Sequence, residues 1–229
     1  NSENFEAILI KGQLLQLIND FIFAEKTYLK IPENSQYFID AQRNIAFNYS
    51  RENVFTDAEN KIKKIVKKNN SDYELKKILA DFYRIQKKYN SAINLFTELI
   101  ANNSEDAWYM YYLRGICYEQ SDKWDKAEKD FIESLKLKRN SPDVLNYLAY
   151  GWIERDMKID ESFVMLTDAY NANPDSYYIL DSLAWAYFKK KDYEKAAELM
   201  EEVIDMVPGE AISLDHLGDI YFAMNRKRE

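Results

Sequence analysis

Small and bulky apolar residues recur along the chain at intervals of 34 or 35 residues, with polar residues between them. The first set of small residues is Gly12, Ala46, Ala80, Gly115, Ala149, Ala184 and Gly218. Three positions after each of these comes a bulky residue: Leu15, Tyr49, Tyr83, Tyr118, Trp152, Tyr187 and Tyr221. The second set of small residues is Ala24, Ala58, Ala92, Ala127, Ser162 and Ala196. A fixed period of this length is the signature of a repeat architecture.

The spacing predicts two antiparallel helices in each repeat. Residues no larger than alanine or serine at the eighth and twentieth positions let the two helices approach, and larger residues fill the seam. Pro142, Pro174 and Pro208 fall in the links between repeats, where a fixed φ and a missing N–H end one helix and admit the next. Pro32 is irregular, and we expect it to shorten the second helix of the first repeat.

The period divides the chain into one continuous array. The predicted repeats cover residues 5–38, 39–72, 73–107, 108–141, 142–176 and 177–210, and a half repeat covers 211–229. The last interval has room for its first helix alone, and the chain begins without Met. We therefore expect this chain to be a piece of a longer protein.

Composition supports an all-α fold. The chain has five glycines and four prolines in 229 residues, too few for the many turns of a β-sandwich or barrel. Hydrophobic residues make up 47% and charged residues 31%, which is typical of a folded chain with a core. No apolar run approaches the ~18 residues of a membrane span, so no transmembrane segment is predicted in this piece.

The best-matched intervals are YLRGICYEQSDKWDKAEKDFIESLKL, LNYLAYGWIERDMKIDESFVMLTDAYNANPDS and YYILDSLAWAYFKKKDYEKAAELMEEVIDMVPGE. The chain resembles a tetratricopeptide repeat (TPR) protein, which implies an all-α, right-handed α-solenoid of helix-turn-helix repeats. The strings LNYLAYGW, DSLAWAYF and DHLGDIYF are also similar to the final repeats of bacterial TPR scaffolds and lipoproteins of the Gram-negative envelope. That similarity favours the cell envelope or periplasm over the cytoplasm.

The resemblance implies a protein-protein interaction scaffold whose first helices line a concave groove. Positions 2, 5, 9, 12 and 13 of those helices face the groove, and in the C-terminal half they are mainly aromatic and acidic. The candidate partner-binding residues are Tyr109, Tyr112, Glu119, Asn146, Tyr150, Tyr178, Asp181, Trp185, Phe188, Asp215 and Asp219. Residues 108–229 hold 16 basic and 24 acidic residues, whereas residues 1–107 are neutral. This pattern predicts a protein or peptide ligand with basic and apolar side chains.

Other chemistry is poorly represented. The single cysteine, Cys117, sits at a core position, and the single histidine, His216, has only Asp215 and Asp219 as helical neighbours. The lysines of KIKKIVKK flank core residues and lie on an outer helix face, and the chain is acidic overall, so no nucleic-acid partner is predicted. We predict no enzymatic activity, metal or cofactor.

Two alternatives to the scaffold remain open. The chain could be the regulatory or targeting region of a larger enzyme, such as a TPR-bearing glycosyltransferase. It could also be a homo-oligomerisation module in which the open terminal repeat, with Leu214, Leu217, Ile220 and Tyr221, stacks on a second copy.

Overall fold

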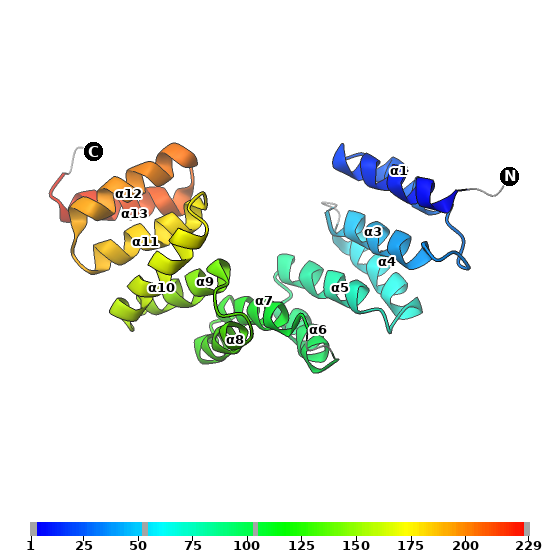
Figure 1. Ribbon diagram of the computed structural model, residues 1–229, viewed down its shortest axis with the longest axis horizontal. Helices are drawn as coiled ribbons and strands as arrows, with labels where there is room; N and C mark the ends of the chain where they lie inside the picture. Colours follow the sequence, from blue (N-terminus) through cyan, green and yellow to red (C-terminus); the bar gives the residue numbers. More distant parts are fainter. Residues whose placement is uncertain (1–3, 52–54, 103–104, 227–229) are drawn as a thin grey trace. The chain divides into compact units, whose positions relative to one another are not determined.

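The computed structural model describes residues 4–51, 55–102 and 105–226 (Figure 1). In those ranges the chain forms thirteen helices and no strand. The helices are α1 (Phe5–Leu17), α2 (Phe21–Tyr28), α3 (Phe38–Arg51), α4 (Phe55–Lys68), α5 (Tyr73–Ile85), α6 (Tyr89–Asn102), α7 (Ala107–Glu119), α8 (Trp124–Leu137), α9 (Pro142–Ile153), α10 (Ile159–Ala172), α11 (Tyr177–Lys189), α12 (Tyr193–Met206) and α13 (Ala211–Ala223).

The chain divides into two compact units, residues 1–127 and 128–229. Helices α1–α7 belong to the first unit and α9–α13 to the second, and α8 crosses the division. Odd-numbered helices occupy the first half of each 34- or 35-residue interval and even-numbered helices the second half. The pairs α1/α2, α3/α4, α5/α6, α9/α10 and α11/α12 pack together as helical hairpins. The predicted repeat limits and the single array stay predictions.

The small residues lie where two helices approach. All six residues of the second small-residue set are completely buried, and every member of the first set except Gly218 is buried. Gly12 illustrates the reason: a Cβ added there would lie 2.2 Å from Tyr28 Cε1. Tyr28 is itself buried, and its hydroxyl donates to Gln16 Oε1 at 2.5 Å. The close approach of α1 and α2 therefore requires glycine at position 12.

The hairpin turns share one backbone feature. In six of the intervals, the fifteenth residue lies four positions after the bulky residue that follows the first small residue, and it has a positive φ of 51–65°. These residues are Asn19, Lys87, Asp122, Asp156, Lys191 and Asn225. In the turn after α11, Lys191 N–H donates to Phe188 O and Asp192 N–H donates to Tyr187 O. This is the Schellman arrangement, in which a left-handed residue ends the helix and satisfies its last carbonyls.

Pro32 has the expected effect on the first hairpin. Helix α2 has 8 residues, whereas α4, α6, α8, α10 and α12 each have 14. Residue 32 would donate its N–H to Tyr28 O if the helix continued, but proline has no N–H and its ring clashes with that carbonyl. The helix accordingly ends at Tyr28.

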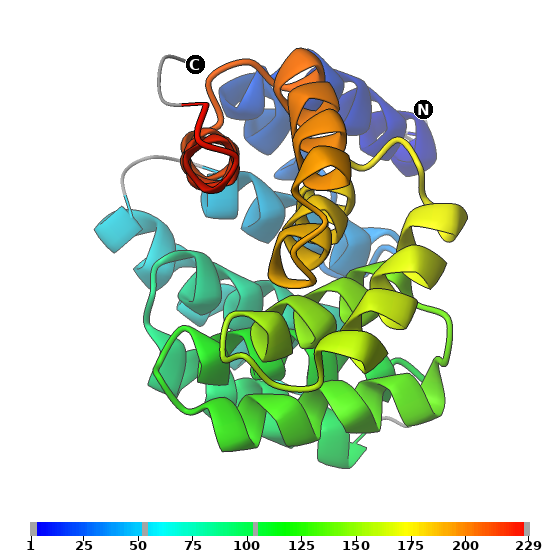
Figure 2. The ribbon, with the colours of Figure 1, turned by 90° about the vertical axis from the view of Figure 1, so that its left-hand side faces the viewer.

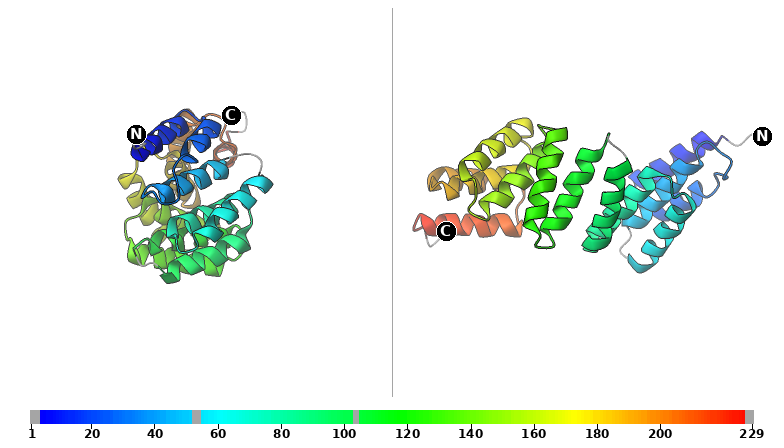
Figure 3. Two further views of the ribbon diagram at one scale, coloured as in Figure 1. Left: turned by 90° about the vertical axis from the view of Figure 1, so that its right-hand side faces the viewer. Right: turned by 90° about the horizontal axis from the view of Figure 1, so that it is seen from below.

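The core of the second unit surrounds α11. Eight consecutive residues of this helix, 179–186, are buried, because α9, α10, α12 and α13 all pack against it. Figure 2 shows α13 nearly end-on beside α12, and the right panel of Figure 3 shows the yellow to red helices of this unit lying together. Leu180, Leu183, Met200 and Ile220 share this core. Side chains on α11 are therefore positioned by helices that come both before and after it in the chain.

Candidate partner-binding site

Asp181 is the most deeply placed acidic residue among the candidates. It lies on α11 and is 6% exposed. Ser213 Oγ donates to Asp181 Oδ2 at 2.5 Å, and His216 Nδ1 lies 2.9 Å from Asp181 Oδ1. Both partners come from α13, so one carboxylate joins the two helices. Because burial of a carboxylate is costly unless it is bonded, these two contacts make Asp181 a structural connection inside the unit.

The arrangement of Asp181, Ser213 and His216 differs from a nucleophilic relay. In a Ser-His-Asp triad the serine passes its proton to the imidazole, and the carboxylate bonds the far side of that ring. Here the Ser213 hydroxyl donates directly to the Asp181 carboxylate. A hydroxyl held by a carboxylate in this way is not activated through His216.

Three rings stack beside this carboxylate. The Trp185 ring lies parallel to Phe188, with centroids 4.5 Å apart, and to His216, with centroids 4.1 Å apart. Trp185 Nε1 donates to Glu154 Oε1 at 2.7 Å. Glu154 is the C-cap residue of α9, and its carboxylate satisfies the only donor of the indole. Trp185 is only 6% exposed, whereas Phe188 is half-buried. Phe188 is therefore the more accessible aromatic member of the stack.

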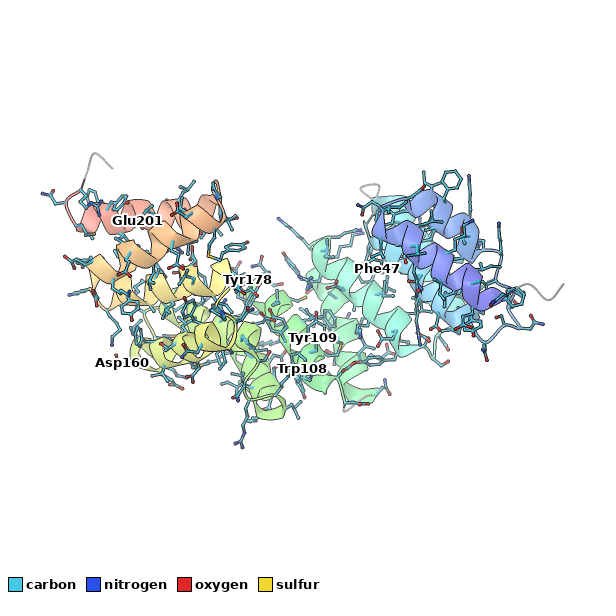
Figure 4. All side chains as sticks on the ribbon, turned by 45° about the horizontal axis from the view of Figure 1, so that its top comes forward. Phe47, Trp108, Tyr109, Asp160, Tyr178 and Glu201 are labelled. Atoms are coloured by element: carbon cyan, nitrogen blue, oxygen red, sulfur yellow. The ribbon has the colours of Figure 1, made fainter. Side chains whose placement is uncertain are left out.

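Tyr178 lies at the start of α11 and is 40% exposed (Figure 4). Its hydroxyl donates to Asp143 Oδ1 on α9 at 2.8 Å. Burial of the phenol, together with this bond to a carboxylate, raises the pKa of Tyr178 above its ordinary value of 10.0. The ring face is thus available to a partner while the hydroxyl stays a donor to Asp143.

Helix α13 carries an exposed stripe of apolar and acidic side chains. Ile212, Asp215, Asp219 and Phe222 recur at three- and four-residue spacing, so they share one face of the helix. Ile212 and Phe222 are among the exposed large apolar side chains. The carboxylates of Asp215 and Asp219 form no hydrogen bond or ion pair with any residue that the structure describes. Both are exposed, so they can bind a cationic side chain of a partner.

The three candidates in the first unit all lie on α7. Tyr109 is exposed, and its ring lies 5.3 Å from Trp108 and 6.0 Å from Tyr112 between centroids. Figure 4 shows Trp108 and Tyr109 together on this helix. Tyr112 and Glu119 are half-buried, and Glu119 accepts a hydrogen bond from Gln120 Nε2. This group is aromatic with a single carboxylate.

Charged residues of α3 and α5 form ion pairs within each helix, and one ion pair joins α3 to Asp72, the N-cap of α5. Arg43 bonds Asp72 at 2.7 Å and 3.2 Å, and it also contacts Asp40. Lys77 lies 2.8 Å from Glu74, and Arg84 lies 2.7 Å from Asp81. The side-chain bond to Asp72 raises the pKa of Arg43. These ion pairs neutralise much of the charge that α3 and α5 carry.

The eleven candidates therefore fall into three groups by accessibility. Exposed residues are Tyr109, Tyr178, Asp215 and Asp219; half-buried residues are Tyr112, Glu119, Tyr150 and Phe188; and buried residues are Asn146, Asp181 and Trp185. The structure brings Asp181 and Trp185 together at His216, with Phe188 stacked on Trp185, and the Tyr150 ring lies 6.3 Å from that imidazole. Their assignment as partner contacts stays a prediction.

Sequence reasoning missed the roles of Ser213 and His216. It related His216 to Asp215 and Asp219 on its own helix, whereas the imidazole bonds Asp181, 35 residues earlier. One signal could have found this contact. Ser213 stands at the third position of its interval, where five earlier intervals carry Ala41, Leu75, Met110, Val144 and Ile179. A polar residue at a position that is otherwise apolar indicates a buried polar partner.

Cys117 is the single cysteine of the chain. The Cys117 thiol is buried, and burial raises its pKa to about 12. Across the residues that the structure describes, no group of three or more His, Cys, Asp or Glu side chains could hold a metal ion. In the same part of the chain, no helix has the length and apolar character needed to cross a membrane.

Sequence comparison relates two segments of the chain to a known repeat. The family model described as tetratricopeptide repeat matches residues 83–144 and 165–211. The TPR repeat-containing protein PA4667 of Pseudomonas aeruginosa is 24% identical over 110 residues. That alignment covers 48% of this chain and 18% of the relative. The chain thus matches less than a fifth of the length of this curated relative.

Solved structures share the fold. A tetratricopeptide repeat protein from Parabacteroides merdae has a TM-score of 0.74 at 20% identity, covering 98% of this chain and 88% of the other. The pilF protein of Pseudomonas aeruginosa has a TM-score of 0.75 at 17% identity, covering 93% and 96%. YrrB, described as a TPR protein with an unusual peptide-binding site, has a TM-score of 0.58 at 17% identity, covering 82% and 96%. At these identities the likeness extends to the fold alone, an all-α TPR solenoid.

Proposed function

Because this chain is a tetratricopeptide repeat protein, we propose that it is a non-enzymatic scaffold that binds a segment of a protein partner through its first helices. Repeats of this kind act in general as protein-protein interaction scaffolds. The peptide-binding site named for YrrB is consistent with a peptide ligand here. We infer the binding surface, and the kind of side chain that it selects, from the exposed side chains of the second unit.

The observation that carries the proposal is the stripe on α13. Two unpaired carboxylates, Asp215 and Asp219, lie between two exposed apolar side chains, Ile212 and Phe222. Aromatic and aliphatic surface supplies contact area, and carboxylates at its centre select lysine or arginine. We expect the partner segment to carry basic residues next to aliphatic or aromatic ones.

Half-buried aromatic side chains on α9 and α11 add further apolar contact area. Tyr150 and Phe188 keep part of each ring accessible, and both belong to the cluster around Trp185 and His216. Trp185 and Asp181 support the site from beneath because they are buried and bonded. They hold α11 and α13 together, and the exposed residues make the contacts.

A random-peptide display library panned on the immobilised chain tests the proposal. Enriched peptides should carry Lys or Arg next to apolar residues, and Asp215→Lys with Asp219→Lys should remove that enrichment. Asp168→Lys with Asp175→Lys is the matched control, since both residues are exposed and the change in net charge is the same. Enrichment of peptides without basic residues, or equal loss in both double variants, would contradict the proposed selectivity.

A further inference from the structure

Helix α2 presents three large apolar side chains and two lysines on one face, called its outer face below. Ile22, Phe23 and Leu29, which is the C-cap residue, are 67%, 58% and 63% exposed. Lys26 and Lys30 are exposed as well. At 3.6 residues per turn, these five residues share an arc of about 120°. The arc lies opposite the buried side of the helix, so packing inside the first hairpin does not use it.

The corresponding face is open in later hairpins too. In α6, which has helices before and after it, all five residues at these positions are exposed: Asn90, Ser91, Asn94, Thr97 and Glu98. In α12, four of the five are exposed: Glu194, Glu198, Glu201 and Glu202. Neighbouring helices of the array therefore leave this face uncovered. The outer face of α2 is open whether or not another hairpin precedes it.

The apolar character of this face is specific to α2. At the same five positions, α4, α6 and α12 hold no large apolar residue, and α8 and α10 hold one each, Ile132 and Val164. Three exposed large apolar residues on one turn-and-a-half of helix are thus a departure from the other second helices. Exposed apolar patches of this kind mark interaction surfaces.

Charge on the second helices also differs along the chain. Residues 21–30 and 55–68, which include α2 and α4, hold seven basic and three acidic residues. Residues 159–172 and 193–206, which form α10 and α12, hold one basic and eight acidic residues. Two acidic residues of the first group are already bonded, since Glu25 accepts from the Tyr49 hydroxyl and Glu59 pairs with Lys63. An anionic partner is therefore attracted to α2 and α4 and repelled by α10 and α12.

We infer that the outer face of α2 is a contact surface for an anionic phospholipid bilayer. Ile22, Phe23 and Leu29 would enter the boundary between headgroups and acyl chains, and Lys26 and Lys30 would reach the phosphates above them. Lys26 Nζ lies 5.2 Å from the centroid of the Phe23 ring, so the ammonium group and the ring already occupy the same face. Lysine has the long apolar stem that this arrangement requires.

The mixture of lysines and apolar residues favours a bilayer over a second copy of the chain. Pairing of two α2 faces about a twofold axis would bring Lys26 and Lys30 of both copies together without a carboxylate between them. The acidic outer faces of α10 and α12 offer carboxylates, but Val164 is their one large apolar residue at these positions. A protein interface must place a carboxylate opposite each lysine that it buries, whereas phosphates cover the whole surface of an anionic bilayer.

Cosedimentation of the 229-residue chain with sucrose-loaded vesicles tests the inference. The chain should bind vesicles of equal parts phosphatidylcholine and phosphatidylglycerol, and at least about tenfold more weakly those of phosphatidylcholine alone. Lys26→Glu with Lys30→Glu should lower binding to the anionic vesicles at least about tenfold, because two attractions become repulsions. Phe23→Ser with Leu29→Ser should have a loss of similar size, because it removes the apolar contact.

Each double variant has a matched control on other second helices. Lys126→Glu with Lys129→Glu changes the net charge equally, and both lysines are exposed on the corresponding face of α8. Leu137→Ser with Val164→Ser removes two apolar side chains of similar exposure, 57% and 58%, from α8 and α10. Both controls should bind anionic vesicles as the parent chain does. Far-ultraviolet circular dichroism of each variant verifies that the helices are retained.

Three outcomes would overturn the inference. A chain that stays in the supernatant with anionic vesicles would leave the outer face of α2 to a protein partner. Equal losses in the two lysine double variants would make the attraction a property of total charge and not of α2. Self-association of the chain without vesicles, abolished by Phe23→Ser with Leu29→Ser, would assign the face to contact between copies, and sedimentation equilibrium of both proteins measures it.

Discussion

The imidazole of His216 lies flat against the indole of Trp185, with ring centroids 4.1 Å apart and an interplanar angle of 12°. The same imidazole places Nδ1 2.9 Å from Asp181. One side chain of α13 therefore contacts both an aromatic and an acidic residue of α11. These contacts turn two residues of the predicted groove into internal supports, and they decide which substitutions test binding and which test stability.

Asp181→Ala should lower the free energy of unfolding by about 2–4 kcal/mol, because it leaves Ser213 and His216 buried without their shared acceptor. Asp215→Ala, an exposed carboxylate on α13, should change it by less than about 0.5 kcal/mol. Urea denaturation of both variants measures the difference. Equal stabilities would mean that the contacts of Asp181 contribute nothing net to the fold.

Gly12 and Gly218 stand at the same position of their intervals and should respond in opposite directions to alanine. Gly12→Ala should destabilise the chain by about 1–3 kcal/mol, since its Cβ would enter the Tyr28 ring. Gly218→Ala should stabilise α13 by about 0.5–1 kcal/mol, because nothing lies within 4 Å of the new Cβ and alanine favours the helix. Thermal unfolding compares the two variants with the parent chain, and a shift of the same sign in both would contradict this account.

Cys117 should resist alkylation while the chain is folded. Burial raises its pKa to about 12, so at pH 8 only about one thiol in ten thousand is ionised, and the thiolate is the reactive form. Mass spectrometry should find no iodoacetamide adduct on the native chain and one adduct after unfolding in urea. Rapid labelling of the native chain would show that the thiol is reached without global unfolding.

Glu59 should make stability depend on acid pH. Its side chain bonds Lys63 and Lys88, and the bond to Lys63 is the larger cause that lowers the pKa of Glu59 below 4.5. A carboxylate with a lowered folded pKa stabilises the fold fully above its unfolded pKa, and this contribution is lost as pH falls through the folded value. Glu59→Gln should therefore cost about 1 kcal/mol at pH 7 and close to nothing at strongly acid pH.

Urea denaturation at a series of pH values measures the contribution of Glu59. Glu161→Gln on α10 is a suitable control, since Glu161 is exposed. A constant difference between Glu59→Gln and the parent chain across the acid range would contradict the assigned ion pairs.

The array of helical hairpins could be predicted because its determinants are local. Gly12, Ala24 and Tyr28 lie within one hairpin, so their spacing along the chain already specifies which side chains meet across the seam. The short α2 followed in the same way from Pro32, whose missing N–H acts on a carbonyl four residues earlier. Such effects depend on residues that are close in sequence and on the fixed geometry of the α-helix.

The availability of the candidate site could not be predicted in that way. Helical position indicates the direction of a side chain from its own helix, and by that criterion Asp181 and Trp185 point toward the groove with Tyr178. The packing of α13 against α11 covers the first two with Ser213 and His216 and leaves Tyr178 exposed. Burial depends on how every neighbouring helix packs, including one that begins 30 residues after Asp181.

The sequence by itself thus determined the repeated hairpin, its small-residue contacts and the acidic character of the second half, because these follow from composition and short spacing. Only the tertiary structure decided that Asp181 joins two helices and that Asp215 and Asp219 stay exposed. Each of these is a statement about solvent access. Solvent access is a property of the packed helices together, and no single helix carries it in its own pattern.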